Sequence, residues 1–236
     1  MTKRFSKLAT EGILIVASIL IAFAIDAWWE DRQDRHEEQR LLEALKAEFS
    51  TNIKIITPHI EGHRTSNLYA KELSDLLGKT QTDGSVNVRA AELGQVINHG
   101  STDPQTGVID AILQSGELRY ITNPEIRERL AGWPSLIVDA RENEDMLQMQ
   151  WEARLLEAMS EVADLYPLEN MGPECWSDPK LDVCRHIFIT MTRSNKVIAY
   201  LGPVIGYTAE AARELQTLVK EAENIVSLIN AELEKK

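Results

Sequence analysis

The apolar run from Gly12 to Ile25 determines how the rest of this chain is interpreted. It is the longest uncharged run in the 236 residues, and it lies between Glu11 and Asp26. Trp28 and Trp29 follow directly. Such a run must be removed as a signal, buried in a core or held in a membrane. Which of these three applies determines the compartment in which the rest of the chain folds.

The run is too short to cross a membrane by itself. Its 14 residues make a helix of about 21 Å, whereas a hydrocarbon core is about 30 Å thick. A helix from Leu8 to Trp29 reaches about 33 Å if Glu11 and Asp26 lie near the two interfaces. Trp28 and Trp29 suit the interface belt at one end. The sequence therefore predicts a basic tail (1–7) and a transmembrane anchor (8–29), in contact with the lipid bilayer.

Two other interpretations of the run are weaker. A basic start followed by an apolar run resembles a secretory signal, and Ala22-Phe23-Ala24 offers a cleavage site. Glu11 at the start of the run and Asp26 just after that site argue against cleavage. The basic tail before the run and the Trp pair after it argue against a helix buried in a soluble core. An uncleaved anchor is the prediction.

The positive charges on the two sides of the run bear on its orientation. Lys3, Arg4 and Lys7 precede the run, and Arg32, Arg35 and Arg40 after it nearly balance them, because the acids among those arginines count little. A long body would follow an anchor whose N-terminus stays in the cytoplasm across the membrane. The prediction is an N-terminus in the cytoplasm and a body (30–236) on the outer side of the membrane. Cys175 and Cys184 agree with an oxidising compartment.

One face of the predicted anchor gathers its small and acidic residues. At 100° per residue, Glu11, Ser18, Ala22 and Asp26 fall within roughly a third of a turn. Small residues let helices approach closely, and a carboxylate in a membrane prefers a protein partner to lipid. The face predicts contact with a membrane protein or a second copy of the chain. The alternative is that Glu11 and Asp26 only mark the ends of the span and touch water.

This N-terminal pattern resembles a family of uncharacterised bacterial membrane proteins. The shared features are Glu11, the Ile19-Leu20-Ile21-Ala22 run and the Trp28-x-Glu30 exit into a charged helix. The resemblance covers about 35 residues and is looser beyond them. It implies a single-pass protein of the bacterial inner membrane with a periplasmic helical domain, and it implies no activity. Asp26, Trp29 and the segment with the two cysteines depart from the family pattern.

The rest of the chain is acidic and helical in character. The net charge is −12, so contact with nucleic acid is not expected. Twelve Gly and eight Pro are few for the many turns of a β-sandwich. The predicted fold is all-α, in which the transmembrane helix continues into a long stalk helix and then an antiparallel helical bundle.

Helical periodicity places the elements of that bundle. The stalk is charged on all sides up to Arg40 and then carries an apolar stripe from Leu41 to Ile56, before Pro58 ends or kinks it. Further helices are expected, at 59–77, 86–98, from Thr102 or Asp103 to Gln114, from Asn123 to about Leu165 with a bend near Pro134, and from about Arg185 with breaks at Gly202-Pro203 and Gly206.

The segment 166–184 has no helical period. It carries three prolines, Gly172 and both cysteines. In an oxidising compartment Cys175 and Cys184 would form a short-range disulfide that encloses Trp176, and in the cytosol they would stay reduced. The prediction is an ordered loop with a disulfide.

The search for chemistry finds only weak candidates. His59 and His63 have the i,i+4 spacing that aims two imidazoles at one metal, but a helix start with two surface histidines explains them equally well. Ser101, Asp103 and His99 share one loop, where turn and cap chemistry is the usual explanation. There is no phosphate loop, dinucleotide fingerprint or nucleophile elbow.

We therefore expect no cofactor and no metal, and we do not expect an enzyme. The leading functional prediction is a membrane-tethered structural or accessory subunit that acts through protein–protein contacts. A ligand-binding, sensor-like helical bundle outside the cytoplasm is the alternative.

Overall fold

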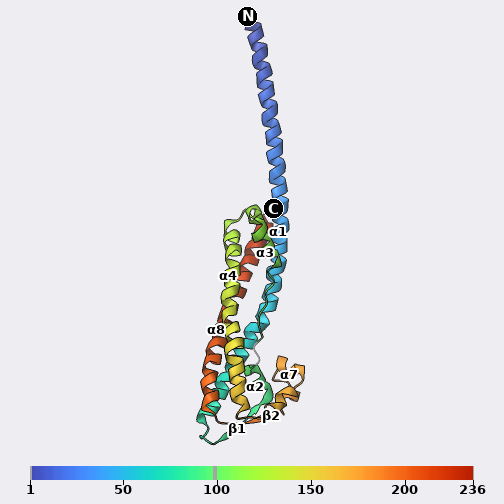
Figure 1. Cartoon of the computed structure of the whole chain (residues 1–236). Coiled ribbons are helices and arrows are strands. Elements are labelled where there is room, and N and C mark those ends of the chain that lie inside the picture. Colours follow the sequence, from blue (N-terminus) through green and yellow to red (C-terminus); the bar gives the residue numbers. More distant parts are fainter. Residues whose placement is uncertain (1, 98–99, 236) are drawn as a thin grey trace.

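The computed structural model describes residues 2–97 and 100–235, and for residues 2–13, 150–152 and 177 it describes the backbone without the side chains. Long helices dominate (Figure 1). In chain order the elements are α1 (Thr2–Lys79), β1 (Ser85–Arg89), α2 (Ala90–Ile97), α3 (Gly107–Ser115), the 3-10 turn η1 (Glu117–Tyr120), α4 (Pro124–Met146), the π-helical η2 (Leu147–Glu152), α5 (Ala153–Ser160), α6 (Tyr166–Glu169), α7 (Pro173–Ser177), the 3-10 turn η3 (Asp182–Cys184), β2 (Phe188–Thr192) and α8 (Asn195–Leu233).

Helix α1 runs without interruption for 78 residues. The sequence predicted that Pro58 ends or kinks the stalk helix. The helix does not end there, because Pro58 lies inside α1. A proline in a helix costs about 3 kcal/mol through its missing N–H and its ring. Ile56 and Ile60, on either side of it, are both buried. Packing of one continuous face across Pro58 outweighs that local cost.

Three long helices form the bundle. Helices α1 and α4 run in the same direction, and α8 returns between them so that its C-terminal end lies beside α1 (Figure 1). Helix α8 packs against both other helices. It is one helix from Asn195 to Leu233 and contains Pro203, so the predicted breaks at Gly202-Pro203 and Gly206 do not occur. A helical bundle was predicted correctly, and in it α8 is the long helix that runs antiparallel to the other two.

A small β-sheet corrects the all-α prediction. Strands β1 and β2 pair antiparallel, with Val88 opposite Ile189 and Val86 opposite Met191. Residues 86–89 were predicted as part of a helix, and so was the segment after Arg185. Side chains alternate along each strand, so that Val88, Ile189 and Met191 are buried while their neighbours are more exposed. Val86, Val88 and Ile189 are β-branched and favour a strand once the partner strand, about 100 residues away in the sequence, lies beside them.

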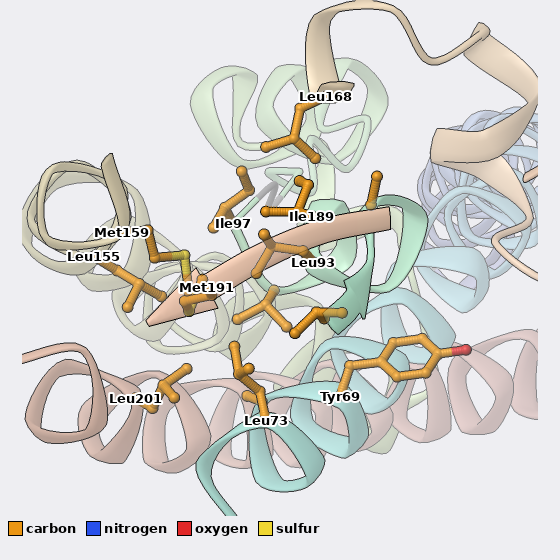
Figure 2. Close-up of a cluster of buried hydrophobic side chains, with 14 of the residues drawn as sticks. Tyr69, Leu73, Leu93, Ile97, Leu155, Met159, Leu168, Ile189, Met191 and Leu201 are labelled. Atoms are coloured by element: carbon orange, nitrogen blue, oxygen red, sulfur yellow. The ribbon is translucent and has the colours of Figure 1, made fainter. Parts of the chain in front are cut away.

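Two hydrophobic cores fill the bundle. The proximal core lies toward the free part of α1 and includes Phe49, Trp133 and Ile225. The distal core lies around the sheet and includes Leu93, Met191 and Leu201, as Figure 2 shows. Helix α2 and the strands contribute to the distal core and to no part of the proximal one.

Several helix ends follow the sequence signals. The Asn123 side chain accepts hydrogen bonds from the backbone N–H of Glu125 (3.0 Å) and Ile126 (3.3 Å), as expected of a cap. Gly116 ends α3 with a φ of 76°. Helix α3 begins at Gly107, later than predicted from Thr102 or Asp103. The helix predicted from Asn123 to about Leu165 is divided by the π-helical turn η2 and ends at Ser160.

Candidate functional site

The first candidate is the N-terminal part of α1, which extends alone beyond the bundle (Figure 1). Its large apolar side chains from Leu14 to Ile25 are each 49–66% exposed. They follow one another closely along the helix, so they cover all of its sides. They are Leu14, Ile15, Val16, Ile19, Leu20, Ile21, Phe23 and Ile25.

Among the residues with described side chains, which start at Leu14 in this helix, none of the helices is long and apolar enough to cross a membrane. The predicted span from Leu8 to Trp29 begins before that point. The transmembrane part of the predicted fold therefore stays a prediction.

The predicted interface pair follows the apolar part. Trp28 and Trp29 are 58% and 62% exposed, with ring centroids 6.4 Å apart. The guanidinium carbon of Arg32 lies 5.9 Å from the Trp28 ring centroid, within the range of a cation–π contact. An aromatic ring beside a cation, next to an apolar helix surface, is the arrangement that suits a membrane–water boundary.

The predicted contact face is open in the structure. Ser18, Ala22 and Asp26 are exposed, and the Ser18 hydroxyl donates to the carbonyl oxygen of Leu14 in its own helix (2.7 Å). The side chain of Glu11 lies outside the described residues. The contact face therefore stays a prediction.

The second candidate is a polar network inside the bundle. Nε2 of His63 lies 2.8 Å from Oε1 of Glu144. Thr102 donates to the same carboxylate through its backbone N–H (2.9 Å) and its hydroxyl (2.8 Å). All three side chains are at most 3% exposed. Burial raises the pKa of Glu144, but the hydrogen bonds from His63 and Thr102 together lower it further, so the pKa lies below its ordinary value of 4.5.

This network lies at the boundary between the two cores. His63 follows Ile60 of the proximal core and precedes Tyr69 of the distal core. On the same level, Asn67 donates to the Ile205 carbonyl (2.6 Å) and to the Thr208 hydroxyl (3.0 Å). A buried polar layer thus separates two apolar regions, and it connects α1 to α4, α8 and the segment after α2.

Further polar side chains of α1 hold the segment that connects α2 to α4. Asn52 donates to the Gln105 carbonyl (2.8 Å) and accepts from the Gln105 N–H (2.7 Å). Glu48 accepts from the N–H groups of Val108 (2.6 Å) and Ile109 (3.1 Å) at the start of α3. A carboxylate at the positive end of a helix dipole is favourable there.

Glu38 completes the series. It is 1% exposed and accepts from the backbone N–H (2.6 Å) and hydroxyl (2.7 Å) of Thr122. Residues 105–122 therefore run antiparallel to α1 from Asn52 back to Glu38, attached by three α1 side chains that make six hydrogen bonds. This series was not predicted from the sequence. Its signal was present, because Glu48 and Asn52 interrupt the apolar stripe from Leu41 to Ile56.

The predicted metal candidates do not converge. His63 is buried against Glu144, whereas His59 is half-buried and faces the loop at Gly100, where an added Cβ would lie 3.5 Å from its ring. No group of three potential metal ligands occurs among the residues the structure describes.

The loop with Ser101, Asp103 and His99, which was only a weak candidate for catalysis, was explained from the sequence by turn and cap chemistry. Asp103 is exposed and lies 3.4 Å from Arg141 in an ion pair. His99 lies outside the described residues. Thr102, the one buried side chain among the described residues 100–106, bonds to Glu144 and so belongs to the polar network.

A disulfide joins Cys175 and Cys184, both at most 1% exposed, with Cα atoms 5.5 Å apart. The loop it closes packs on α2. Trp176 lies over Gly94, where an added Cβ would come within 2.9 Å of the ring. The Gln95 side chain donates to the Trp176 carbonyl (2.7 Å). The enclosed tryptophan therefore attaches the segment 166–184 to the bundle, and short helices α6 and α7 form within that predicted loop.

Comparison with family models, curated proteins and solved structures finds no match to this chain. The resemblance to a bacterial membrane-protein family therefore stays a prediction.

Proposed function

We propose that this chain is a membrane-anchored helical protein that acts through protein–protein contacts as a structural or accessory subunit. The observation that carries the proposal is the apolar surface of α1 from Leu14 to Ile25, exposed on all sides of a helix that leaves the bundle. Water does not stabilise such a surface. At about 25 cal/mol per Å² of apolar area, its exposure is costly.

A bilayer fits this surface better than a single partner helix. A partner helix covers one stripe and leaves the other sides in water, whereas a helix that is apolar all round is typical of a membrane span. Trp28, Trp29 and Arg32 follow in the order expected at a boundary with water. The proposed span, Leu8 to Trp29, begins before Leu14, which is the first residue of α1 whose side chain the structure describes.

The continuity of α1 supports a tethering role. One helix forms both the apolar extension and one side of the bundle, to which α8 and the segment 105–122 attach. A bundle on such a stalk is held at a defined distance and orientation from the point of attachment. The polar groups of His63, Thr102 and Glu144 at the centre of the bundle hydrogen-bond to one another. These groups therefore hold the helices together and do not line an open site.

For topology, we propose a cytoplasmic N-terminus and a periplasmic bundle in a bacterial inner membrane. The basic residues before the apolar run and the disulfide between Cys175 and Cys184 support this side. A reporter that is active only in the periplasm, fused after Lys236, should be active. Activity only of a cytoplasmic reporter would overturn the placement.

Membrane fractionation of the full chain tests the anchor. Wild type should stay with membranes after carbonate washing. Replacing Ile19 and Phe23 together by Arg should release much of it, because each Arg near the middle of a span costs about 3 kcal/mol. The matched control replaces exposed Leu68 and Leu76 of the bundle by Arg and should remain in the membrane. A wild-type chain in the soluble fraction would refute the anchor.

The partner is tested separately. We propose that the face with Glu11, Ser18, Ala22 and Asp26 contacts a membrane protein or a second copy. Purification in mild detergent should retain a partner that is lost in Glu11→Gln or Asp26→Asn. A partner retained by both variants would show that these carboxyl groups only mark the ends of the span.

One observation favours the alternative, a ligand-binding bundle. A hollow of about 470 Å³ lies between α1 and α8, lined in part by Arg64, Asn67 and Arg213. Arg64 and Arg213 are exposed, so they could meet an anionic ligand. Saturable binding of a small anion that Arg64→Gln weakens would favour this alternative.

A further inference from the structure

A second group of cations lies where the free part of α1 meets the bundle. The end of α8 comes back beside α1 at this level (Figure 1). A hollow of about 370 Å³, which we call the neck hollow, lies between α1 and the residues just after α8. Its lining consists of Arg32, Arg35, His36, Gln39 and Lys235. All five can donate hydrogen bonds, and the lining includes no carboxylate.

Neighbouring contacts hold these donors in place. Arg35 pairs with Asp31 on α1, and the Lys235 amine lies 3.0 Å from a Glu232 oxygen on α8. Arg32 lies against the Trp28 ring. A guanidinium has five N–H donors and an ammonium three, so one contact leaves others available. Arginine and lysine side chains held in this way suit a phosphate group.

The position of the neck hollow along α1 favours the phosphate of a lipid over a free phosphate ion. Arg32 is three residues beyond Trp29, which is about 4.5 Å along a helix. If the tryptophans lie at the interface of the bilayer, the neck hollow is at the level of the lipid phosphates. This step rests on the membrane anchor proposed above.

The charge of the rest of the protein makes such a site useful. The chain has a net charge of −12, so an anionic membrane surface repels the bundle. Arg32, Arg35 and Lys235 in the lining provide a local attraction, because each Lys or Arg near an anionic surface is attracted to it.

We propose that the neck hollow binds the phosphate of an anionic phospholipid headgroup in the leaflet that faces the bundle. The lipid's acyl chains would lie along the apolar surface of α1, and its phosphate would accept hydrogen bonds from Arg32, Arg35 and Lys235. The bound lipid would fix the depth of α1 and the distance of the bundle from the membrane.

The test uses the full chain in nanodiscs that contain brominated phosphatidylglycerol or brominated phosphatidylcholine. Quenching of Trp28 and Trp29 reports the neighbouring lipid, and Trp28→Phe/Trp29→Phe supplies the background of the other tryptophans. From mixtures, wild type should prefer phosphatidylglycerol by at least about fivefold, the effect of one cation near an anionic surface. Arg32→Gln/Arg35→Gln/Lys235→Gln should reduce the preference to near unity.

The control Lys54→Gln/Lys71→Gln/Lys220→Gln removes the same charge from exposed sites on the bundle and should keep the preference. Equal loss in both variants, or no preference in wild type, would overturn the headgroup site. Inorganic phosphate at matched ionic strength should not change the quenching, and release of the lipid preference by phosphate would assign the hollow to the free ion. Absence of quenching by either lipid would instead refute the membrane anchor.

Discussion

The Glu144 carboxylate and the His63 imidazole, 81 residues apart in the chain, lie 2.8 Å apart with almost no exposure to solvent. The contact joins α4 to α1 at the level where the two hydrophobic cores meet. Removing one partner of such a buried pair leaves the other without its hydrogen bond, which costs more than the pair itself contributes.

Glu144→Gln should lower the free energy of unfolding by about 1–3 kcal/mol at pH 7, because the amide has one accepting oxygen and its NH2 group cannot accept the hydrogen bond that the second carboxylate oxygen takes from the Thr102 N–H. The effect should depend on pH. The pKa of Glu144 is lowered in the folded state, so its stabilisation is present above the ordinary value of 4.5 and is lost as pH falls through the folded pKa.

Denaturant unfolding at a series of pH values measures how the effect of Glu144→Gln on stability depends on pH. The difference between wild type and Glu144→Gln should be largest above pH 4.5 and should shrink in acid. The exposed Glu223→Gln is the control and should change stability by less than about 0.5 kcal/mol. A difference that grows in acid would contradict the direction of the pKa shift.

Asn52→Ala should destabilise the protein by about 1–3 kcal/mol, because it leaves the N–H and the carbonyl of Gln105 without their partner. Hydrogen exchange should increase first in the segment from Thr102 to Thr122, which α1 holds in place. The exposed Asn224→Ala serves as the control. Unchanged exchange in that segment would show that its own packing holds it.

Gly94→Ala should loosen the disulfide loop. The new Cβ would lie 2.9 Å from the Trp176 ring and 3.2 Å from the end of Met171. Overpacking of this kind costs about 1–3 kcal/mol, which exceeds the gain of up to about 1 kcal/mol in helix propensity. Gly62→Ala, with nothing within 4 Å of the new Cβ, should instead stabilise by about 0.5–1 kcal/mol.

Thermal unfolding of the two glycine variants should thus shift in opposite directions, and near-ultraviolet circular dichroism should change only for Gly94→Ala. A stabilised Gly94→Ala would mean that Trp176 can move away from α2 without loss of contacts.

Trp133→Phe should change the free energy of unfolding by less than about 1.5 kcal/mol, although Trp133 is fully buried. Its indole N–H is the one buried side-chain donor without a partner in the part of the chain that the structure describes. Phe removes that unsatisfied group and keeps an aromatic ring near Phe49, whose centroid is 4.7 Å away.

Trp133→Ala, by contrast, should cost about 3–5 kcal/mol because it leaves a cavity in the proximal core. Chemical denaturation of both variants compares the effect of removing the indole N–H with the effect of leaving a cavity. Equal losses would indicate that the indole N–H has a partner in solution.

Features that depend on neighbouring residues could be predicted from the sequence. The helical character of the body, the cap at Asn123 and the end of α3 at Gly116 follow from local periodicity and backbone preference. Local signals failed where a distant partner was needed. Val86 and Val88 form a strand because Met191 and Ile189 lie opposite, and Pro58 stays in a helix because Ile56 and Ile60 pack on both sides of it.

Tertiary structure alone decided the role of the polar residues. His63 has the spacing of a metal ligand to His59, yet Glu144 binds it from another helix. Glu38, Glu48 and Asn52 hold backbone groups far along the chain, and no local pattern shows which groups these are. A buried polar group must find its partner wherever the fold brings one. The apolar run from Gly12 to Ile25 needs no such partner within the chain, so the sequence determined its character, and the structure showed that the bundle leaves its described part uncovered.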